Sequence, residues 1–143
     1  MDDRNTALPG YHVRLEATPK ASSELRRSLR SWLTNVGASD EDAFDVTLAC
    51  CEAFANAVGR PTGRAPSTVE IEAVVDPRRL LTVVIRDHVC SRGERGLDET
   101  RAFLRLMEAL MESAETYARD DGVTLVLRKR LRYAYPQALA AGA

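Results

Sequence analysis

The chain has 143 residues, of which 45% are hydrophobic and 29% are charged, and this size and composition indicate one folded domain and exclude a disordered segment. Its 20 Lys and Arg residues against 21 Asp and Glu residues leave a net charge of -1, which gives no general attraction to nucleic acid or to an anionic membrane. The three cysteines lack zinc-binding spacing and indicate reduced thiols. Together with the lack of a signal-peptide or membrane-spanning run, they predict a cytoplasmic protein.

The N-terminal part of the chain predicts one strand and one helix. Residues 1–10 are expected to form a flexible lead-in, and the weak alternation of residues 11–16 indicates a strand. A helix is expected from about Ser22 or Ser23 to Gly37, because apolar residues recur every three or four positions and glycine ends a helix readily. Trp32 lies on the apolar face of this helix and is assigned to the core or to a dimer interface.

A second helix is expected from the cap residue Ser39 to about Val58, with acidic residues in its first turn. Glu52 and Asn56 are polar residues in an otherwise apolar, Ala-rich stretch of this helix. Their spacing is just over one helical turn, so the carboxylate and the amide share one face, which we expect to be the inner face. Such a pair suits a hard cation or a hydroxyl to be activated; the alternative is a solvated or internally hydrogen-bonded helix pair.

The C-terminal half predicts a hairpin, a loop, a helix and a second pair of strands. The expected elements are strand 69–75, turn 76–79, strand 81–87, loop 88–98, helix 100–111, strand 116–118 and strand 123–131. In the last strand the alternation points Val123, Leu125 and Leu127 inward. The Ala-rich tail, residues 133–143, is expected to fray.

This order of elements predicts a single α+β domain over residues 11–132. The expected architecture is a two-layer sandwich in which helices cover one face of a mixed, mainly antiparallel sheet. The sequence contains no internal repeat that would indicate a second unit.

The order of elements, with Glu52 and Asn56 on the second helix and Asp87 at the end of the hairpin, resembles the GHKL ATPases of the Bergerat, or histidine kinase-like, fold. Among them it is similar to the small single-domain bacterial anti-sigma-factor serine/threonine kinases. The similarity covers roughly residues 10–132. Its strongest part is residues 48–58, which are similar to the family's N-box. The hairpin end Val84-Ile85-Arg86-Asp87, the segment 106–111 and the closing strand 122–129 also match.

The resemblance implies roles for four residues and a requirement for ATP and magnesium. Asn56 would hold a Mg²⁺ ion that bridges the nucleotide phosphates, and Glu52 would be the catalytic residue that polarises the hydroxyl of a substrate serine. Asp87 would accept a hydrogen bond from the adenine amino group. Thr124 would offer a cofactor-binding hydroxyl, because the family's closing Gly-Thr pair is Gly122-Val123 here.

The glycine motifs of the family are missing. The Asp-x-Gly-x-Gly motif is replaced by Asp87-His88-Val89-Cys90-Ser91, and Phe103 lies within the segment where glycines precede the helix after the lid. Glycine serves in such motifs because it has no Cβ and lets the backbone approach a phosphate. Gly93 and Gly96 are either displaced remnants of a lid or ordinary loop glycines.

The resemblance implies a transcription regulator that sequesters a sigma factor and phosphorylates a small anti-anti-sigma partner, without contacting nucleic acid or a membrane. It also implies a homodimer formed through the first strand and helix. Because the glycine motifs are eroded, kinase activity stays open, and the alternative is a partner-binding regulator that keeps the fold but no longer uses nucleotide. A third hypothesis is an unrelated α+β domain with coincidental matches. His12 and His88 are assigned no role.

Overall fold

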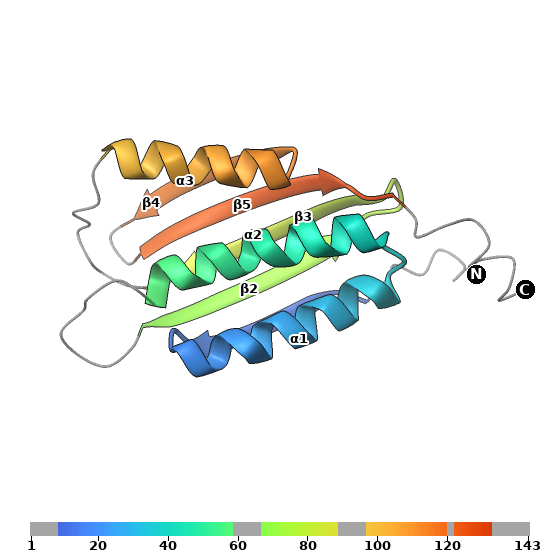
Figure 1. Ribbon diagram of the computed structural model, residues 1–143, viewed down its shortest axis with the longest axis horizontal. Coiled ribbons are helices and arrows are strands. Elements are labelled where there is room, and N and C mark those ends of the chain that lie inside the picture. Colours follow the sequence, from blue (N-terminus) through green and yellow to red (C-terminus); the bar gives the residue numbers. More distant parts are fainter. Residues whose placement is uncertain (1–8, 59–66, 89–96, 120–121, 133–143) are drawn as a thin grey trace, which may run out of the picture.

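The computed structural model describes residues 9–58, 67–88, 97–119 and 122–132. Residues 1–8 and 133–143, which include most of the expected lead-in and the expected tail, lie outside the described residues. The elements of the described part are shown in Figure 1. They are β1 (Tyr11–Glu16), α1 (Pro19–Asn35), α2 (Asp40–Val58), β2 (Thr68–Val75), β3 (Leu80–Asp87), α3 (Leu97–Leu110), β4 (Ser113–Arg119) and β5 (Gly122–Arg130).

The described strands form one sheet of order β1-β2-β3-β5-β4, and every pairing in it is antiparallel. The helices α1, α2 and α3 cover one face of this sheet, with α2 between the other two (Figure 1). The α+β two-layer sandwich is therefore confirmed, whereas the expectation of a mixed sheet is wrong for the described strands, because none of them pairs in parallel. None of the described helices is long and apolar enough to cross a membrane.

The register of the sheet aligns the apolar side chains beneath the helices. Ile71 pairs with Ile85, which pairs with Leu125, and all three are buried. Phe54 of α2 and Met107 of α3 are completely buried in the same core. Each such side chain contributes about 1.5–3 kcal/mol by leaving water, so the alternation of the strands decides which face the helices cover.

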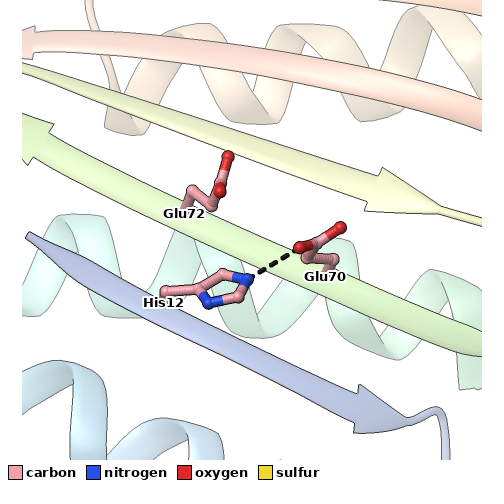
Figure 2. Close-up of side chains that lie close together, drawn as sticks. All are labelled: His12, Glu70 and Glu72. Carbon is pink, nitrogen blue, oxygen red and sulfur yellow. Dashed lines mark hydrogen bonds and ion pairs between the residues drawn. The ribbon is translucent and has the colours of Figure 1, made fainter.

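The opposite face of the sheet carries polar side chains and is not covered by any described helix. Along β1 and β2, the alternation turns His12, Glu70 and Glu72 to this side, and in Figure 2 the helices lie behind the strands that carry them. We call this surface the open face. A sheet with one solvated face shows this alternation of apolar and polar residues.

The first helix begins earlier than the sequence predicts. α1 starts at Pro19, and Thr18 is its N-cap, with Oγ1 of Thr18 accepting a hydrogen bond from the Ala21 N–H at 3.3 Å. Proline suits the first turn because its missing N–H has no helical partner there and its φ is already helical. The start predicted near Ser22 is therefore wrong, because Thr18 caps the helix and Pro19 begins it.

Trp32 lies in the core, which decides between the two environments predicted for it. Its side chain is 8% exposed, and its ring centroid lies 5.7 Å from that of Tyr11. The indole N–H donates a hydrogen bond to the Pro9 carbonyl at 2.8 Å, so the polar edge of the ring has a partner. Trp32 thus joins α1 to β1 and to the segment of chain just before β1.

Two C-terminal elements differ in length from the prediction. α3 spans Leu97–Leu110 instead of 100–111, and β4 spans Ser113–Arg119 instead of 116–118. β4 is an edge strand whose polar sequence has little intrinsic strand preference, and its length comes from pairing with β5 along its whole extent. Local composition could not have shown that pairing.

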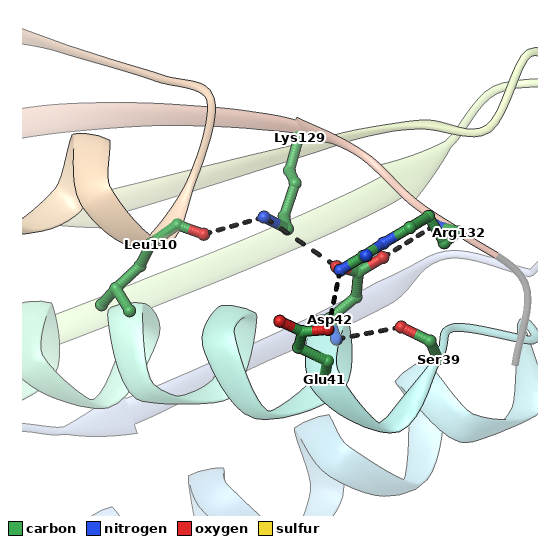
Figure 3. A network of polar contacts seen from close by, with 6 residues as sticks. All are labelled: Ser39, Glu41, Asp42, Leu110, Lys129 and Arg132. Carbon is green, nitrogen blue, oxygen red and sulfur yellow. Dashed lines mark hydrogen bonds and ion pairs between the residues drawn. The ribbon is translucent and has the colours of Figure 1, made fainter.

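A buried carboxylate anchors the beginning of α2 to the C-terminal end of the sheet (Figure 3). Asp42 is fully buried, and its two oxygens accept hydrogen bonds from the backbone N–H of Arg132 at 2.7 Å and from Nη2 of Arg132 at 3.0 Å. Nζ of Lys129 lies 3.9 Å from the same carboxylate and donates to the Leu110 carbonyl at 3.1 Å. The cap predicted at Ser39 is confirmed, because Oγ of Ser39 accepts from the Asp42 N–H at 3.1 Å.

These contacts set the charge state of Asp42. Burial by itself raises the pKa of this carboxyl, but the hydrogen bonds from Arg132 and the positive charges of Arg132 and Lys129 outweigh it, so the pKa lies below its ordinary value. We call these residues, Asp42, Lys129 and Arg132, the anchor. It holds α2, α3 and β5 together at one end of the molecule.

Candidate functional site

The candidate residues come from elements that meet at the opposite end of α2 from the anchor. The carboxyl ends of α2 and β3 lie together at this end of the molecule, beside the beginnings of α3 and β5 (Figure 1). We call it the site end. The antiparallel arrangement explains this placement, since β5 begins where β3 ends: Asp87 pairs with Val123.

Glu52 and Asn56 lie on α2 at the border between its buried face and solvent. Glu52 is exposed and Asn56 is half-buried, whereas Ala53, Phe54 and Ala57 form the inner face in this stretch. The expectation that the pair lies on the inner face is therefore wrong. The one-turn spacing still aligns the two side chains along the helix, with Asn56 in its last turn and more protected from water.

Asp87 is the last residue of β3 and lies on the helix-covered face of the sheet. Its cross-strand partners are Val69 of β2, which is buried, and Val123 of β5. It shares the alternation of Ile85, whose side chain packs in the core. Asp87 is half-buried, so a carboxylate lies at the rim of the core on the side where α2 ends.

Thr124 is not brought together with these residues. It pairs with Arg86, so the alternation of β5 directs it to the open face, away from Asp87. The residue opposite Asp87 is Val123, which occupies the position of the family's threonine and has no hydroxyl. The geometry gives no support to a contact between Thr124 and a ligand bound beside Asp87.

Gly122 is a position at the site end that sequence reasoning gave no role. Its backbone φ is +146°, an angle that residues other than glycine rarely adopt. A Cβ at this position would lie 2.1 Å from the Asp87 carbonyl oxygen. Glycine is therefore required for β5 to begin directly against the end of β3. Its place before Val123, where the family has a Gly-Thr pair, was the signal that could have revealed it.

Most of the loop between β3 and α3 lies outside the described residues. This part includes Val89, Cys90, Ser91, Gly93 and Gly96. Within α3, Phe103 is half-buried and packs against the core.

The described residues fit the base and metal ends of a bound nucleotide. An amide oxygen at the end of α2 is a ligand type that Mg²⁺ accepts, and a half-buried carboxylate can accept a hydrogen bond from an amino group. The missing Cβ of Gly122 keeps the backbone beside Asp87 free of side-chain bulk. These features are consistent with a nucleotide site, and the comparison with known proteins agrees with it.

The model of the histidine kinase-like ATPase domain matches residues 15–129. Among solved structures, the RsbU and RsbW domains of Rv1364c from Mycobacterium tuberculosis are similar, with a TM-score of 0.70 and 29% identity over 86% of this chain and 32% of that chain. The histidine kinase domain from Erythrobacter litoralis EL346 blue-light activated histidine kinase has a TM-score of 0.52 and 20% identity over 82% of this chain and 65% of that chain, a likeness of fold alone.

The chain spans about a third of the length of the first solved structure and just under two thirds of the second. The family match does not depend on those lengths, because it covers most of this chain in one segment that contains Glu52, Asn56 and Asp87. Domains of this class bind nucleotides. The chain belongs to the histidine kinase-like ATPase domain family.

Proposed function

We propose that this domain is a regulator of the anti-sigma kinase class, which binds ATP with Mg²⁺, sequesters a sigma factor and phosphorylates a serine of a small anti-anti-sigma partner. The family match, the similarity to a structure that contains an RsbW domain, and the sequence resemblance support the class. The observation that carries the proposal is the placement of Asn56 and Asp87. Both lie at the site end, and Asp87 is on the helix-covered face. Beside it is Gly122, a position with no room for a side chain.

In this proposal Asp87 recognises the base. A half-buried carboxylate is an acceptor only, so it favours a base edge that presents an amino donor, as adenine does. The strand pairing of Asp87 with both Val69 and Val123 fixes its backbone. A rigid acceptor of this kind discriminates between bases, because a base that presents an acceptor at this position cannot form the hydrogen bond.

Asn56 would hold the magnesium ion through its side-chain oxygen. When bound, the ion neutralises charge on the phosphates, which is the main requirement of phosphoryl transfer. Asn56 suits this role because the last turn of α2 holds it and because it is partly shielded from water.

Glu52 would act on the protein substrate. It lies one turn before Asn56, and its exposure allows a serine hydroxyl from another protein to approach and give up its proton to the carboxylate. An inward-facing carboxylate could not be reached in this way. The exposed position thus fits a base for a macromolecular substrate.

We further propose a cytoplasmic homodimer as the working form, through the first strand and helix as in the family that the sequence resembles. The alternative function is a partner-binding regulator that does not use nucleotide. Two observations favour that alternative: Val123 stands where a threonine hydroxyl is expected, and the glycines of the lid motifs are replaced.

Thermal unfolding of the full chain with and without ATP and Mg²⁺ tests the proposal. A ligand at about 100 times its Kd stabilises the folded state by about 2.7 kcal/mol, so we expect a clear rise in Tm for the wild type. Asn56→Ala should abolish this rise. The matched control is Asn35→Ala, which removes an exposed amide from the last residue of α1 and should leave the rise unchanged.

Glu52→Gln separates binding from catalysis. It should keep the rise in Tm and lose transfer of phosphate to a serine of the partner. No rise for the wild type at millimolar nucleotide would contradict ATP binding and select the nucleotide-independent regulator. A rise that survives in Asn56→Ala would contradict the role of Asn56.

A further inference from the structure

The open face carries a cluster of ligand-type side chains that the proposed function does not use (Figure 2). His12 comes from β1, and Glu70 and Glu72 come from β2. One potential ligand atom from each of these residues lies within 4.8 Å of the others. Nε2 of His12 is 2.7 Å from Oε2 of Glu70. In the register, His12 is directly opposite Glu72, with Glu70 two positions along the same strand and therefore on the same face.

A second histidine, the residue that follows β3, approaches the same carboxylate. Nε2 of His88 lies 3.8 Å from Oε1 of Glu70, so each oxygen of Glu70 has an imidazole beside it. The backbone of His88 is held in place, since its N–H donates to the Thr68 carbonyl at 3.1 Å. β1, β2 and the residue after β3 thus bring two imidazoles and two carboxylates together.

The cluster has a protected centre and exposed outer members. The Glu70 side chain is only 18% exposed, whereas those of His12, His88 and Glu72 are 55%, 37% and 45% exposed. The hydrogen bond from His12 lowers the pKa of Glu70, so Glu70 is a carboxylate at neutral pH. The exposed members can change rotamer around this fixed carboxylate without disturbing the core.

Two arginines occupy the neighbourhood of the carboxylates. Nη1 of Arg86 lies 2.9 Å from Oε1 of Glu72, and Arg14 is directly opposite Glu70 in the register. These side chains balance the two negative charges in the absence of a metal. A bound cation would therefore compete with Arg86 for Glu72, which makes Arg86 an informative position for substitution.

We propose that His12, Glu70, Glu72 and His88 bind a divalent transition-metal ion of the zinc type on the open face. Imidazole nitrogens mixed with carboxylate oxygens suit zinc, whereas magnesium and calcium prefer oxygen ligands alone. At metal–ligand distances of about 2.1 Å, tetrahedral ligand atoms are roughly 3.4 Å apart, so small side-chain rotations would bring His12, Glu70 and Glu72 onto one ion. His88 would complete the set by turning its ring from its present position beside Glu70. Binding would replace the hydrogen bond between Nε2 of His12 and Oε2 of Glu70, with the imidazole proton on Nδ1 so that Nε2 can face the ion.

The metal would link the edge strand β1 to β2 and β3 on the face opposite the nucleotide site. β1 is otherwise held in the sheet by β2 alone. A ligand that binds only the folded state stabilises it, so metal should raise the stability of the domain. We expect this effect without ATP as well, because His12, Glu70 and Glu72 lie on the face of the sheet opposite to Asp87.

Calorimetric titration of Zn²⁺ into the full chain, freed of metal and without a histidine tag, tests the site. Cys51 and Cys90 are changed to serine in every variant, so that thiols do not bind the probe. We expect one equivalent of saturable binding. His12→Gln and Glu70→Gln should each weaken it by more than about tenfold, because even an outer-shell partner of a metal ligand is worth about 10–100-fold in affinity.

Glu16→Gln is the matched control, since Glu16 is an exposed carboxylate on the same strand and face as His12, and it should bind as the parent does. In ¹H–¹⁵N spectra of the imidazole groups, Zn²⁺ should shift the resonances of both His12 and His88. A parent without saturable binding, or binding unchanged in both His12→Gln and Glu70→Gln, would overturn the proposal.

Arg86→Gln adds a test with the opposite sign. Removing this guanidinium frees Glu72, so Zn²⁺ should bind more tightly than in the parent. An affinity that stays the same or falls would contradict the inclusion of Glu72 among the ligands.

Discussion

The two ends of α2 use polar side chains in opposite ways. At the anchor, Asp42 is fully buried and its oxygens contact Arg132 at 2.7 and 3.0 Å. At the site end, Glu52 is exposed and Asn56 is half-buried. A buried charge must be paired inside the protein, whereas partly solvated groups can exchange water for a ligand. One end of the helix therefore holds the fold, and the other end is available for binding.

This contrast means that stability and ligand binding should respond to different substitutions along one helix. Substitutions at the anchor should destabilise the domain without changing which ligand it prefers. Substitutions of Glu52 or Asn56 should do the reverse.

Asp42→Ala should have the largest effect on stability. It leaves the Arg132 backbone N–H without its acceptor and removes the negative charge beside the Lys129 ammonium, and we expect a loss of about 2–4 kcal/mol in the free energy of unfolding. This loss is smaller than that expected for a completely buried ion pair, because the Arg132 side chain is 61% exposed and can be rehydrated. Urea unfolding measures it. Asp42→Asn keeps an acceptor oxygen and should lose less; an equal loss in both would show that packing, and not the hydrogen bonds, is responsible.

Gly122→Ala should cost about 1–3 kcal/mol, the usual cost of a strained backbone conformation, because of its positive φ and the contact of a Cβ with the Asp87 carbonyl. Since the contact is at the end of β3, the substitution should also weaken nucleotide binding. The neighbouring Val123→Thr is the control: it preserves the β-branched shape and should keep the fold. It should also tighten ATP binding by restoring a hydroxyl opposite Asp87. Unchanged stability in Gly122→Ala would contradict the close approach of β5 to β3.

Lowering the pH should gradually remove the contribution of Asp42 to the free energy of unfolding. Its pKa is lowered in the folded state, so its stabilisation is complete above the unfolded value of about 3.9 and is lost as the pH falls through the lower folded value. Unfolding free energies of the wild type and Asp42→Asn, measured from about pH 6 to pH 2.5, should converge as the pH falls. A constant difference over this range would show that Asp42 does not titrate in this way.

Glu52→Gln should have the smallest effect on folding. An exposed side chain away from any buried contact changes stability by no more than about 0.5 kcal/mol. Chemical denaturation of this variant beside Asp42→Ala measures the contrast between the two ends of α2 directly. A loss comparable with that of Asp42→Ala would show that the site end is also structural.

Periodicity and turn chemistry were sufficient to predict the class of fold. The alternation in β2, β3 and β5 and the helical spacing in α1 follow from burial on one face, which a sequence displays directly. The boundaries that were wrong depend on other features. Thr18 and Pro19 serve as a cap, and β4 is a polar edge strand held by its partner.

The site shows the same division. The spacing of Glu52 and Asn56 was visible in the sequence, but their exposure depends on which face of α2 meets the sheet. The misplacement of Thr124 was avoidable, because the alternation that points Val123 and Leu125 inward already turns Thr124 outward.

Long-range pairs were beyond the reach of the sequence. Asp42 contacts a residue 90 positions away, and His12 contacts Glu70 across 58 positions. The packing of α2 on the sheet brings the first pair together and the sheet register brings the second, and a single sequence displays neither.

The most direct test of the account is to compare the binding of ATP and GTP, each with Mg²⁺, to the wild type and to Asp87→Asn. If Asp87 accepts a hydrogen bond from the adenine amino group, the wild type should bind ATP more tightly than GTP, which presents a carbonyl oxygen at that position. In Asp87→Asn the preference should shrink, because an amide can also donate. Equal binding of the two nucleotides by the wild type, or binding of neither, would contradict the assignment of the site end as an adenine nucleotide site.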